Sequence, residues 1–212
     1  MNKKQIILIG AGGHCKSCID VLESENKFEI IGILDLPNRF GQDILGYKII
    51  GNDNDIPQLA KDGQNFLLTV GHLGDSKKRI KLFNLVKSNG GNLPVIISPT
   101  SYVSIHSEIG EGTIIMHQAI VNAETEIGVN CIINSKSLIE HDCRVGDDCH
   151  VSTGAILNGN VTIGSDCFIG SNTTFVNGLT LTNSVFIGIN SLVSKSIKEE
   201  GIYVGSPLRK IK

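Results

Sequence analysis

The sequence contains no tryptophan, and aromatic residues make up only 5% of its 212 residues. That scarcity disfavours the aromatic platforms on which proteins stack bases or glycan rings. Neither sign of charge dominates, because 19 Lys and Arg stand against 21 Asp and Glu, for a formal net charge of -2. With no long basic run either, nucleic acid and anionic membrane surfaces are disfavoured as main partners.

Long apolar runs are missing as well, since none approaches the roughly 20 residues that a membrane span needs. The opening stretch "MNKKQIILIGAGGH" has a basic start and a short apolar run, but it continues into a glycine-rich loop. We interpret it as a strand rather than a signal peptide, which would end in a small-residue cleavage site. Without an export signal, we expect a cytoplasmic protein whose six cysteines are reduced thiols.

Residues 1–97 alternate between two kinds of segment. Short apolar runs predict strands at 5–10, 28–35 and 65–71, and amphipathic patterns predict helices at 14–26 and 76–90. This alternation implies a small three-layer α/β unit with a parallel sheet.

From Ser98 onward the pattern changes to a strict period of six. Every sixth position from Val103 to Val193, sixteen in all, carries a large apolar residue. Neither the 3.6-residue period of a helix nor the two-residue period of a strand produces this spacing. A hexapeptide repeat does, with three hexads forming one triangular coil of a parallel β-helix. We therefore predict a β-helix over residues 98–212.

A second register, four residues after the first, holds small side chains. Twelve of its fifteen positions from Ser107 to Ser191 are Ser, Thr, Ala or Cys. We expect this register to point inward beside the large apolar one, so its cysteines are interpreted as small buried hydrophobes rather than nucleophiles or metal ligands. These cysteines are Cys131, Cys143, Cys149 and Cys167. Asp147 and Asp148 are expected to be solvated turn charges.

Three features together resemble one family. They are the Ile-Gly-x-x-x-x form of the hexads, the "GAGGH" motif of the preceding α/β region and the closing "VGSPLRK". The chain resembles the hexapeptide-repeat bacterial sugar acetyltransferases, which include sialic-acid O-acetyltransferases and nucleotide-amino-sugar N-acetyltransferases. The resemblance implies an α/β Rossmann-like domain over 1–97 and an all-β left-handed parallel β-helix over 98–212. It also implies acetyl-CoA as co-substrate and a homotrimer with active sites between subunits.

The resemblance also assigns roles to residues of the β-helix. His141 in "IEHDC" would be the catalytic base, with Asn134 and Glu140 nearby. Acetyl-CoA would be held by His150 in "CHVS" and by residues of the later turns, namely Gly159, Gly170, Ser171, Gly188 and Ile189. The basic residues at the end of the chain would meet the phosphates of coenzyme A.

The 18-residue coil predicts where His141 sits. Positions 18 apart stack, so His141 lies between Ala123 and Gly159, in a notch with room for an acceptor amine and a thioester. His150 follows nine residues later, half a coil away, so the two imidazoles should point toward different edges. They would converge only if a second subunit brings its own His150 to the His141 edge.

The chemistry of acetyl transfer suits a histidine. A sugar ammonium must lose a proton near the time of attack, and an imidazole with a pKa of about 6.5 accepts it near neutral pH. A flanking carboxylate can fix the tautomer and stabilise the imidazolium. Glu140 and Asp142 both adjoin His141, and the sequence leaves open which one reaches the ring. The oxyanion needs donors, such as a backbone N–H or His150.

In the N-terminal region, "LIGAGGHCKS" follows a strand and opens a helix, where backbone N–H groups meet phosphates. It differs from the dinucleotide fingerprint, because Cys15 stands where the third glycine belongs. The resemblance implies that Gly12, Gly13, His14 and Asp35 bind a nucleotide-sugar. The family often has a second acid after the first, whereas this chain has Leu36.

Gly71 closes the third strand at the same sheet edge, and Lys78 or Arg79 would supply positive charge there.

With these observations, the resemblance implies an enzyme that N-acetylates the C4 amine of a UDP- or dTDP-linked 4-amino-4,6-dideoxyhexose for surface-glycan biosynthesis. Two alternatives stay open: O-acetylation of a sialic-acid-type sugar, and a non-catalytic β-helix scaffold. A metal is not expected, since His106, His117, His141 and His150 never differ by 18 and therefore do not stack.

Overall fold

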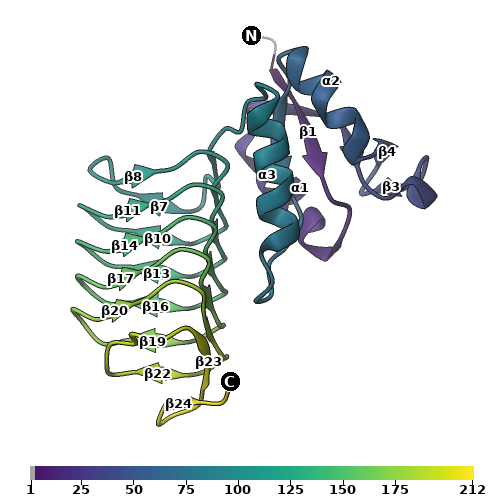
Figure 1. Ribbon diagram of the computed structural model, residues 1–212. Helices are drawn as coiled ribbons and strands as arrows, with labels where there is room; N and C mark the ends of the chain where they lie inside the picture. The colour runs from purple at the N-terminus through teal and green to yellow at the C-terminus, as the bar shows by residue number, and fades with distance from the viewer. Residues whose placement is uncertain (1–2) are drawn as a thin grey trace. The chain divides into compact units, whose positions relative to one another are not determined.

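The computed structural model describes residues 3–212, and the chain divides into two compact units, Met1–Ile96 and Ile97–Lys212. Each unit is described by itself. The first is an α/β unit and the second a stack of triangular coils (Figure 1). Within the described part of the chain, every helix is too short or too polar to cross a bilayer.

The first unit is built on a five-stranded sheet in the order β3-β4-β2-β1-β5. Strands β1, β2, β4 and β5 are parallel, and β3 is antiparallel to β4. The bounds are β1 Lys4–Ile9, β2 Phe28–Leu34, β3 Asp43–Ile44, β4 Tyr47–Gly51 and β5 Asn65–Leu68. The central strand β1 is buried from Ile6 to Ile9, as its unbroken apolar run predicts for a strand covered on both faces.

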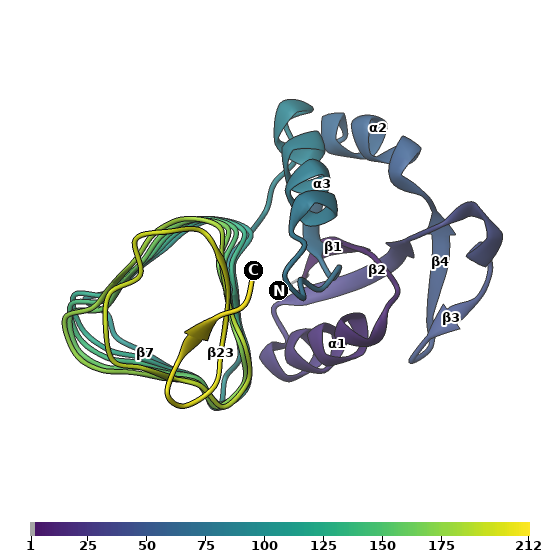
Figure 2. The same cartoon turned by 60° about the horizontal axis from the view of Figure 1, so that its bottom comes forward.

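Helix α1 (Gly13–Glu25) lies on one face of this sheet, and α2 (Ile56–Lys61) and α3 (Lys77–Ser88) lie on the other (Figure 2). Two 3-10 turns, η1 (Pro37–Arg39) and η2 (Asp53–Asp55), complete the unit. The sequence pattern anticipated β1, β2, β5, α1 and α3 to within a few residues. It missed β3, β4 and α2, which are short and depend on pairing and packing for their stability.

In the second unit each hexad forms a strand of two or three residues followed by a turn, and three hexads close one coil. The coils stack into three sheets, made almost entirely of parallel strands, that form the sides of a triangle (Figure 2). Pairing joins residues 18 apart, as in the series Ile120, Leu138 and Ile156. The predicted period and register are therefore confirmed by the strand pairing.

The first sheet of the β-helix contains β7 Tyr102–Val103, β10 Ile120–Val121, β13 Leu138–Ile139, β16 Ile156–Leu157, β19 Thr174–Phe175 and β22 Leu192–Val193. The second contains β8 Glu108–Ile109, β11 Glu126–Ile127, β14 Arg144–Val145, β17 Thr162–Ile163 and β20 Thr180–Leu181. The third contains β6 Ile96–Ile97, β9 Ile114–Ile115, β12 Ile132–Ile133, β15 His150–Val151, β18 Phe168–Ile169, β21 Val185–Ile187, β23 Gly201–Val204 and β24 Arg209–Lys210.

The interior of the coil consists of the two inward registers. The large apolar positions from Ile115 to Val193 form one continuous buried cluster with the small residues beside them. All six cysteines are free and buried. The thiols of Cys131, Cys149 and Cys167 donate to turn carbonyls of the next coil, at 3.2, 3.0 and 3.3 Å. Their interpretation as inward-facing small residues is confirmed.

The turns share one backbone feature that the hexad pattern did not reveal. Every sixth residue from Gly112 to Asn190 has a positive φ, and most of these positions hold Asn, Asp or Gly, the residues that tolerate this conformation best. Two further acids act along these turns. Asp147 accepts the Val129 N–H at 2.9 Å, and Asp148 accepts from Asn130 Nδ2 at 2.6 Å. Asp147 is exposed, as expected of a solvated turn charge, and Asp148 is half-buried. In addition, each joins two coils.

Candidate active site

His141 lies in the turn after β13, between Ala123 and Gly159 in the column of residues 18 apart. The His141 carbonyl accepts the Asn160 N–H at 2.9 Å, and the Asp142 N–H donates to the Ala123 carbonyl at 3.1 Å. A Cβ added to Gly159 would lie 2.7 Å from His141 Cε1 and 2.8 Å from Nε2. The imidazole therefore rests directly on the Gly159 backbone, in the notch that the register predicts.

Asp142, rather than Glu140, contacts the imidazole. His141 Nδ1 lies 2.6 Å from Asp142 Oδ2. Glu140 instead accepts a hydrogen bond from Asn122 Nδ2 at 2.8 Å, across one coil. Both carboxylates influence the ring: the hydrogen bond to Asp142, followed by the negative charges of Asp142 and Glu140, raises the pKa of His141 above its ordinary value.

This geometry determines which ring nitrogen is available for chemistry. With Nδ1–H donated to Asp142, the neutral tautomer carries its lone pair on Nε2. The His141 side chain is 61% exposed, so Nε2 can accept a proton from a molecule that enters the notch. Asp142 then stabilises the resulting imidazolium, as the orienting acid of a catalytic triad does.

Asn134 was expected near His141, and within a single chain it instead lies beside His150. Asn134 Nδ2 lies 3.1 Å from His150 Nε2, while Asn134 Oδ1 accepts the Ser135 N–H at 2.8 Å. Asn134 follows β12 and His150 lies on β15, both in the third sheet, whereas His141 follows a strand of the first sheet. The two histidines thus occupy different edges of the triangle, as the nine-residue spacing predicts.

His150 has an aromatic neighbour in its own sheet. Its ring meets Phe168 edge to face, with centroids 5.2 Å apart, and Phe168 stacks on Phe186 at 4.7 Å. With Nε2 facing the Asn134 amide, the imidazole has a defined orientation.

Of the residues expected to hold acetyl-CoA, His150 lies on β15 of the third sheet and Gly159 lies in the turn after β16 of the first sheet. The other four lie in turns that follow strands of the third sheet: Gly170, Ser171, Gly188 and Ile189. A Cβ at Gly170 would lie 2.5 Å from the Gly188 carbonyl carbon, and one at Gly188 would lie 2.7 Å from Val204 Cγ1. Close stacking of coils therefore requires glycine at both positions. Ser171 Oγ lies 2.9 Å from Ser152 Oγ, and Ile189 is exposed.

The basic residues at the end of the chain, which were expected to meet the phosphates of coenzyme A, differ in their surroundings. Lys210 Nζ is paired with Glu199 at 2.9 Å and lies 5.8 Å from the Tyr203 ring centroid. Arg209 and Lys212 are exposed.

In the α/β unit, the predicted nucleotide residues gather where β1, β2 and β5 end. Helix α1 begins at Gly13, with Gly12 as its N-cap and no side-chain cap. Neither glycine has an atom within 4 Å of the place where a Cβ would be, so both border open space. A Cβ at Gly71 would contact His14 at 3.6 Å, so Gly71 and His14 lie side by side as expected.

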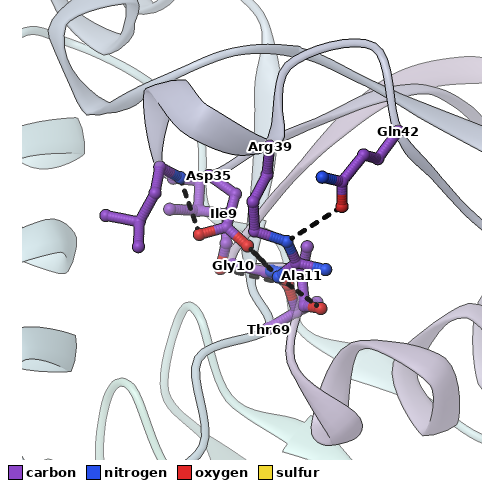
Figure 3. Close-up of polar contacts among 8 residues, drawn as sticks. Ile9, Gly10, Ala11, Asp35, Arg39, Gln42 and Thr69 are labelled. Atoms are coloured by element: carbon purple, nitrogen blue, oxygen red, sulfur yellow. Dashed lines mark hydrogen bonds and ion pairs between the residues drawn. The ribbon is translucent and has the colours of Figure 1, made fainter.

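Asp35 is the remaining predicted residue of this group, and both oxygens of its carboxylate accept hydrogen bonds from other groups of the protein (Figure 3). Its Oδ1 accepts the Leu36 N–H at 2.8 Å. Its Oδ2 accepts the Ala11 N–H at 2.9 Å and Arg39 Nη1 at 2.7 Å. Arg39 is a residue that the sequence analysis missed. The available signal was a basic residue four positions after Asp35, within a Pro-Asn-Arg turn that follows a buried strand.

Of the two residues expected to supply positive charge at this edge, Arg79 is directed at the backbone of the protein itself. Arg79 is buried, and its Nη1 donates to the carbonyls of Leu68 and Val70 at 2.8 and 2.9 Å. Its guanidinium therefore donates hydrogen bonds to backbone carbonyls at the end of β5. Lys78, its neighbour, is exposed.

No group of three or more His, Cys, Asp or Glu that could hold a metal ion occurs within residues 3–212.

The matches to known families follow the division of the chain into an α/β unit and a β-helix. Residues 5–86 match the family described as PglD N-terminal domain, and residues 142–177 match the bacterial transferase hexapeptide family of six repeats. An uncharacterised protein of Acanthamoeba polyphaga mimivirus is 38% identical over 109 residues, which are 50% of this chain. The chain spans only 20% of the length of that relative.

Two solved structures are similar over nearly the whole chain. The acetyltransferase domain of PglB from Neisseria gonorrhoeae has a TM-score of 0.92 and 26% identity, with 99% of this chain and 100% of that chain covered. PerB from Caulobacter crescentus, in complex with CoA and GDP-perosamine, has a TM-score of 0.90 and 28% identity, with 98% and 97% covered. The predicted fold class, a Rossmann-like α/β domain followed by a left-handed parallel β-helix, is confirmed.

Proposed function

We propose that this chain, which is similar to the hexapeptide-repeat sugar acetyltransferases, N-acetylates a nucleotide-linked amino sugar. The acetyl donor is acetyl-CoA, and the acceptor is the C4 amine of a UDP- or dTDP-linked 4-amino-4,6-dideoxyhexose. PglB has been solved with acetyl coenzyme A, and PerB with CoA and GDP-perosamine, which supports both the donor and the general class of acceptor.

The observation that carries this proposal is the contact of His141 with Asp142 above Gly159. An amine is a nucleophile only when it has lost its extra proton, and Nε2 of His141 is a free base at an open notch. The amine nitrogen attacks the thioester carbonyl carbon, and the C–N bond forms as a tetrahedral intermediate. His141 takes the amine proton, and the C–S bond then breaks. The proton passes to the departing sulfur, so the products are the amide and the thiol of coenzyme A.

We also propose that the working unit is a homotrimer whose active sites lie between subunits. His141 and His150 are on different edges of one coil, so a second copy is needed to bring a His150–Asn134 pair to His141. The outward residues of the first sheet are mostly apolar, and Tyr102, Ile120 and Leu192 are exposed. Leu138 and Ile156 continue this column, half-buried. An exposed apolar column of this kind is typical of a protein interface, and it leads to the turn that holds His141.

All six cysteines are free thiols, which fits a reducing compartment, and we place the reaction in the cytoplasm, where it would feed surface-glycan biosynthesis.

The test is an acceptor panel. Purified protein is incubated with acetyl-CoA and with UDP-, dTDP- and GDP-linked 4-amino sugars, free sialic acid, and matched sugars with a hydroxyl at C4, and thiol release is followed. We expect release only with 4-amino nucleotide sugars, and an N-acetyl product by mass spectrometry. Release with sialic acid alone would instead establish an O-acetyltransferase. No release with any acceptor would favour a non-catalytic scaffold.

A further inference from the structure

The segment that follows β2 has an unusual combination of side chains. Leu36 and Phe40 are both exposed large hydrophobic residues, and Phe40 is 68% exposed. Between them, Arg39 closes the η1 turn and bends back toward the loop after β1 (Figure 3). A cation flanked by exposed apolar surface suits a ligand that has both an anionic and a flat apolar part.

The Asp35 carboxylate is already engaged by the protein on both oxygens. Both oxygens already accept hydrogen bonds, from the backbone of Leu36 and Ala11 and from Arg39. The side chain of Asp35 is only 10% exposed, against 30% for Arg39. Of these two side chains, the guanidinium is therefore the more accessible to a ligand that approaches this edge of the sheet.

Among the residues that the structure describes, the guanidinium of Arg39 is bonded to the protein through Nη1 and Nε but not through Nη2. Its Nη1 donates to Asp35 Oδ2 at 2.7 Å and to the Ala11 carbonyl at 3.1 Å, and its Nε lies 3.5 Å from Gln42 Oε1. Within residues 3–212, Nη2 makes no hydrogen bond. Because a guanidinium is planar and rigid, the anchoring of Nη1 also sets the direction of the Nη2 hydrogens.

We propose that Arg39 binds the diphosphate of the nucleotide-sugar and that Asp35 acts as a positioning residue that holds Arg39 in place. This inference rests on the proposed function for the nature of the substrate. Guanidinium N–H groups match phosphate oxygens in geometry and charge. Ala11, to which Arg39 is bonded, leads directly into Gly12 and Gly13, which border open space. The diphosphate therefore has room beside Nη2.

The proposal also accounts for Leu36, where the family often carries a second acid. A free carboxylate beside a diphosphate would repel it, and here the only acid at this point is neutralised by Arg39. Specificity for the base then comes from other contacts, so the loss of Arg39 should weaken all nucleoside diphosphates alike.

The test measures binding of UDP, dTDP, GDP and inorganic pyrophosphate by calorimetry, in wild type, Arg39→Ala, Arg39→Lys and Asp35→Asn. Lys61→Ala, which removes an exposed cation at the end of α2, serves as the matched control. We expect Arg39→Ala to weaken every ligand by about tenfold to a hundredfold, the range for a lost charge-assisted hydrogen bond. Arg39→Lys should not restore binding, because an ammonium lacks the planar, rigid fork that bonds Asp35 and Ala11 through Nη1 and directs Nη2 toward a phosphate.

Asp35→Asn should weaken binding by less than Arg39→Ala, and Lys61→Ala should have no effect. In turnover assays the Arg39 variants should raise KM for the nucleotide-sugar and leave kcat nearly unchanged, a pattern that a general loss of structure would not produce. Equal melting temperatures provide the folding check.

The outcome separates this inference from the proposed function. Wild-type binding of diphosphates that depends on Arg39 supports the inference even if no sugar is acetylated. Unchanged binding in Arg39→Ala, or no binding of any diphosphate by the wild type, overturns the inference, and acetylation of a nucleotide-sugar in the same preparation would leave the function standing.

Discussion

His141 and Asp142 are consecutive residues, yet the Nδ1 of one lies 2.6 Å from the Oδ2 of the other. Neighbouring side chains on an extended strand point to opposite faces, so such a contact requires a turn. Asp142 supplies it, with a φ of 61°. The left-handed position that recurs at every sixth residue thus brings the acid to the base.

Replacement of His141 by Ala should lower kcat by about a hundredfold to ten-thousandfold, the usual contribution of a general base. The folded structure should be unaffected, because the side chain is exposed. His106→Ala, another exposed turn histidine, is the control and should retain full activity. Steady-state kinetics and circular dichroism suffice, and near-normal turnover in His141→Ala would refute the base assignment.

The pH dependence of kcat/KM should report the His141–Asp142 pair. Asp142 raises the pKa of His141, and the base must be neutral, so kcat/KM falls as pH drops through this raised pKa. Asp142→Asn removes the negative charge, which brings the pKa back toward about 6.5. The acid limb should therefore move to lower pH while the maximal rate falls. Profiles from about pH 5 to pH 9 test this, and a limb that moves upward contradicts it.

Gly159→Ala should impair catalysis through the ring of His141. The added methyl would lie 2.7 Å from Cε1, so the imidazole must rotate away from the notch. Turnover should fall, with little change in the free energy of unfolding.

The double variant His141→Ala/Gly159→Ala isolates the cause. If the methyl acts by displacing the ring, it should cost nothing further once the ring is absent. Additive losses would show that Gly159 acts on the cofactor or the coil instead.

The effect of a substitution on the free energy of unfolding should depend on whether its position in the hexad points inward or outward. Phe175 is fully buried in the inward column, and its neighbour Val176 is exposed. Phe175→Ala should reduce the free energy of unfolding by about 3–5 kcal/mol, and Val176→Ala by less than about 0.5 kcal/mol. Urea denaturation compares the two, and equal effects would contradict the hexad assignment.

Association of subunits should depend on the first sheet. Ile120→Glu should convert the proposed trimer to monomers and abolish activity, because a charge on an apolar interface is costly to bury. Thr162→Glu, at an outward position of the second sheet, is the matched control and should leave the trimer intact. Analytical ultracentrifugation measures both, and an unchanged mass for Ile120→Glu would exclude this face.

Much of the architecture follows from the spacing of residues alone. The inward large and small registers, the four buried cysteines of the β-helix and the notch above Gly159 all depend on a period of six, and no distant contact alters that period. The elements β3, β4 and α2 were missed altogether, since such short elements form only through pairing and packing.

The sequence by itself determined which side chains face the core and which residues stack, because a parallel coil of 18 residues leaves one register that buries the apolar positions. The tertiary structure decided which groups meet. Asp142 rather than Glu140 contacts His141. Asn134 lies beside His150, and Arg39 forms an ion pair with Asp35. Such contacts depend on left-handed turns and on the direction of individual side chains, which a repeat pattern does not specify.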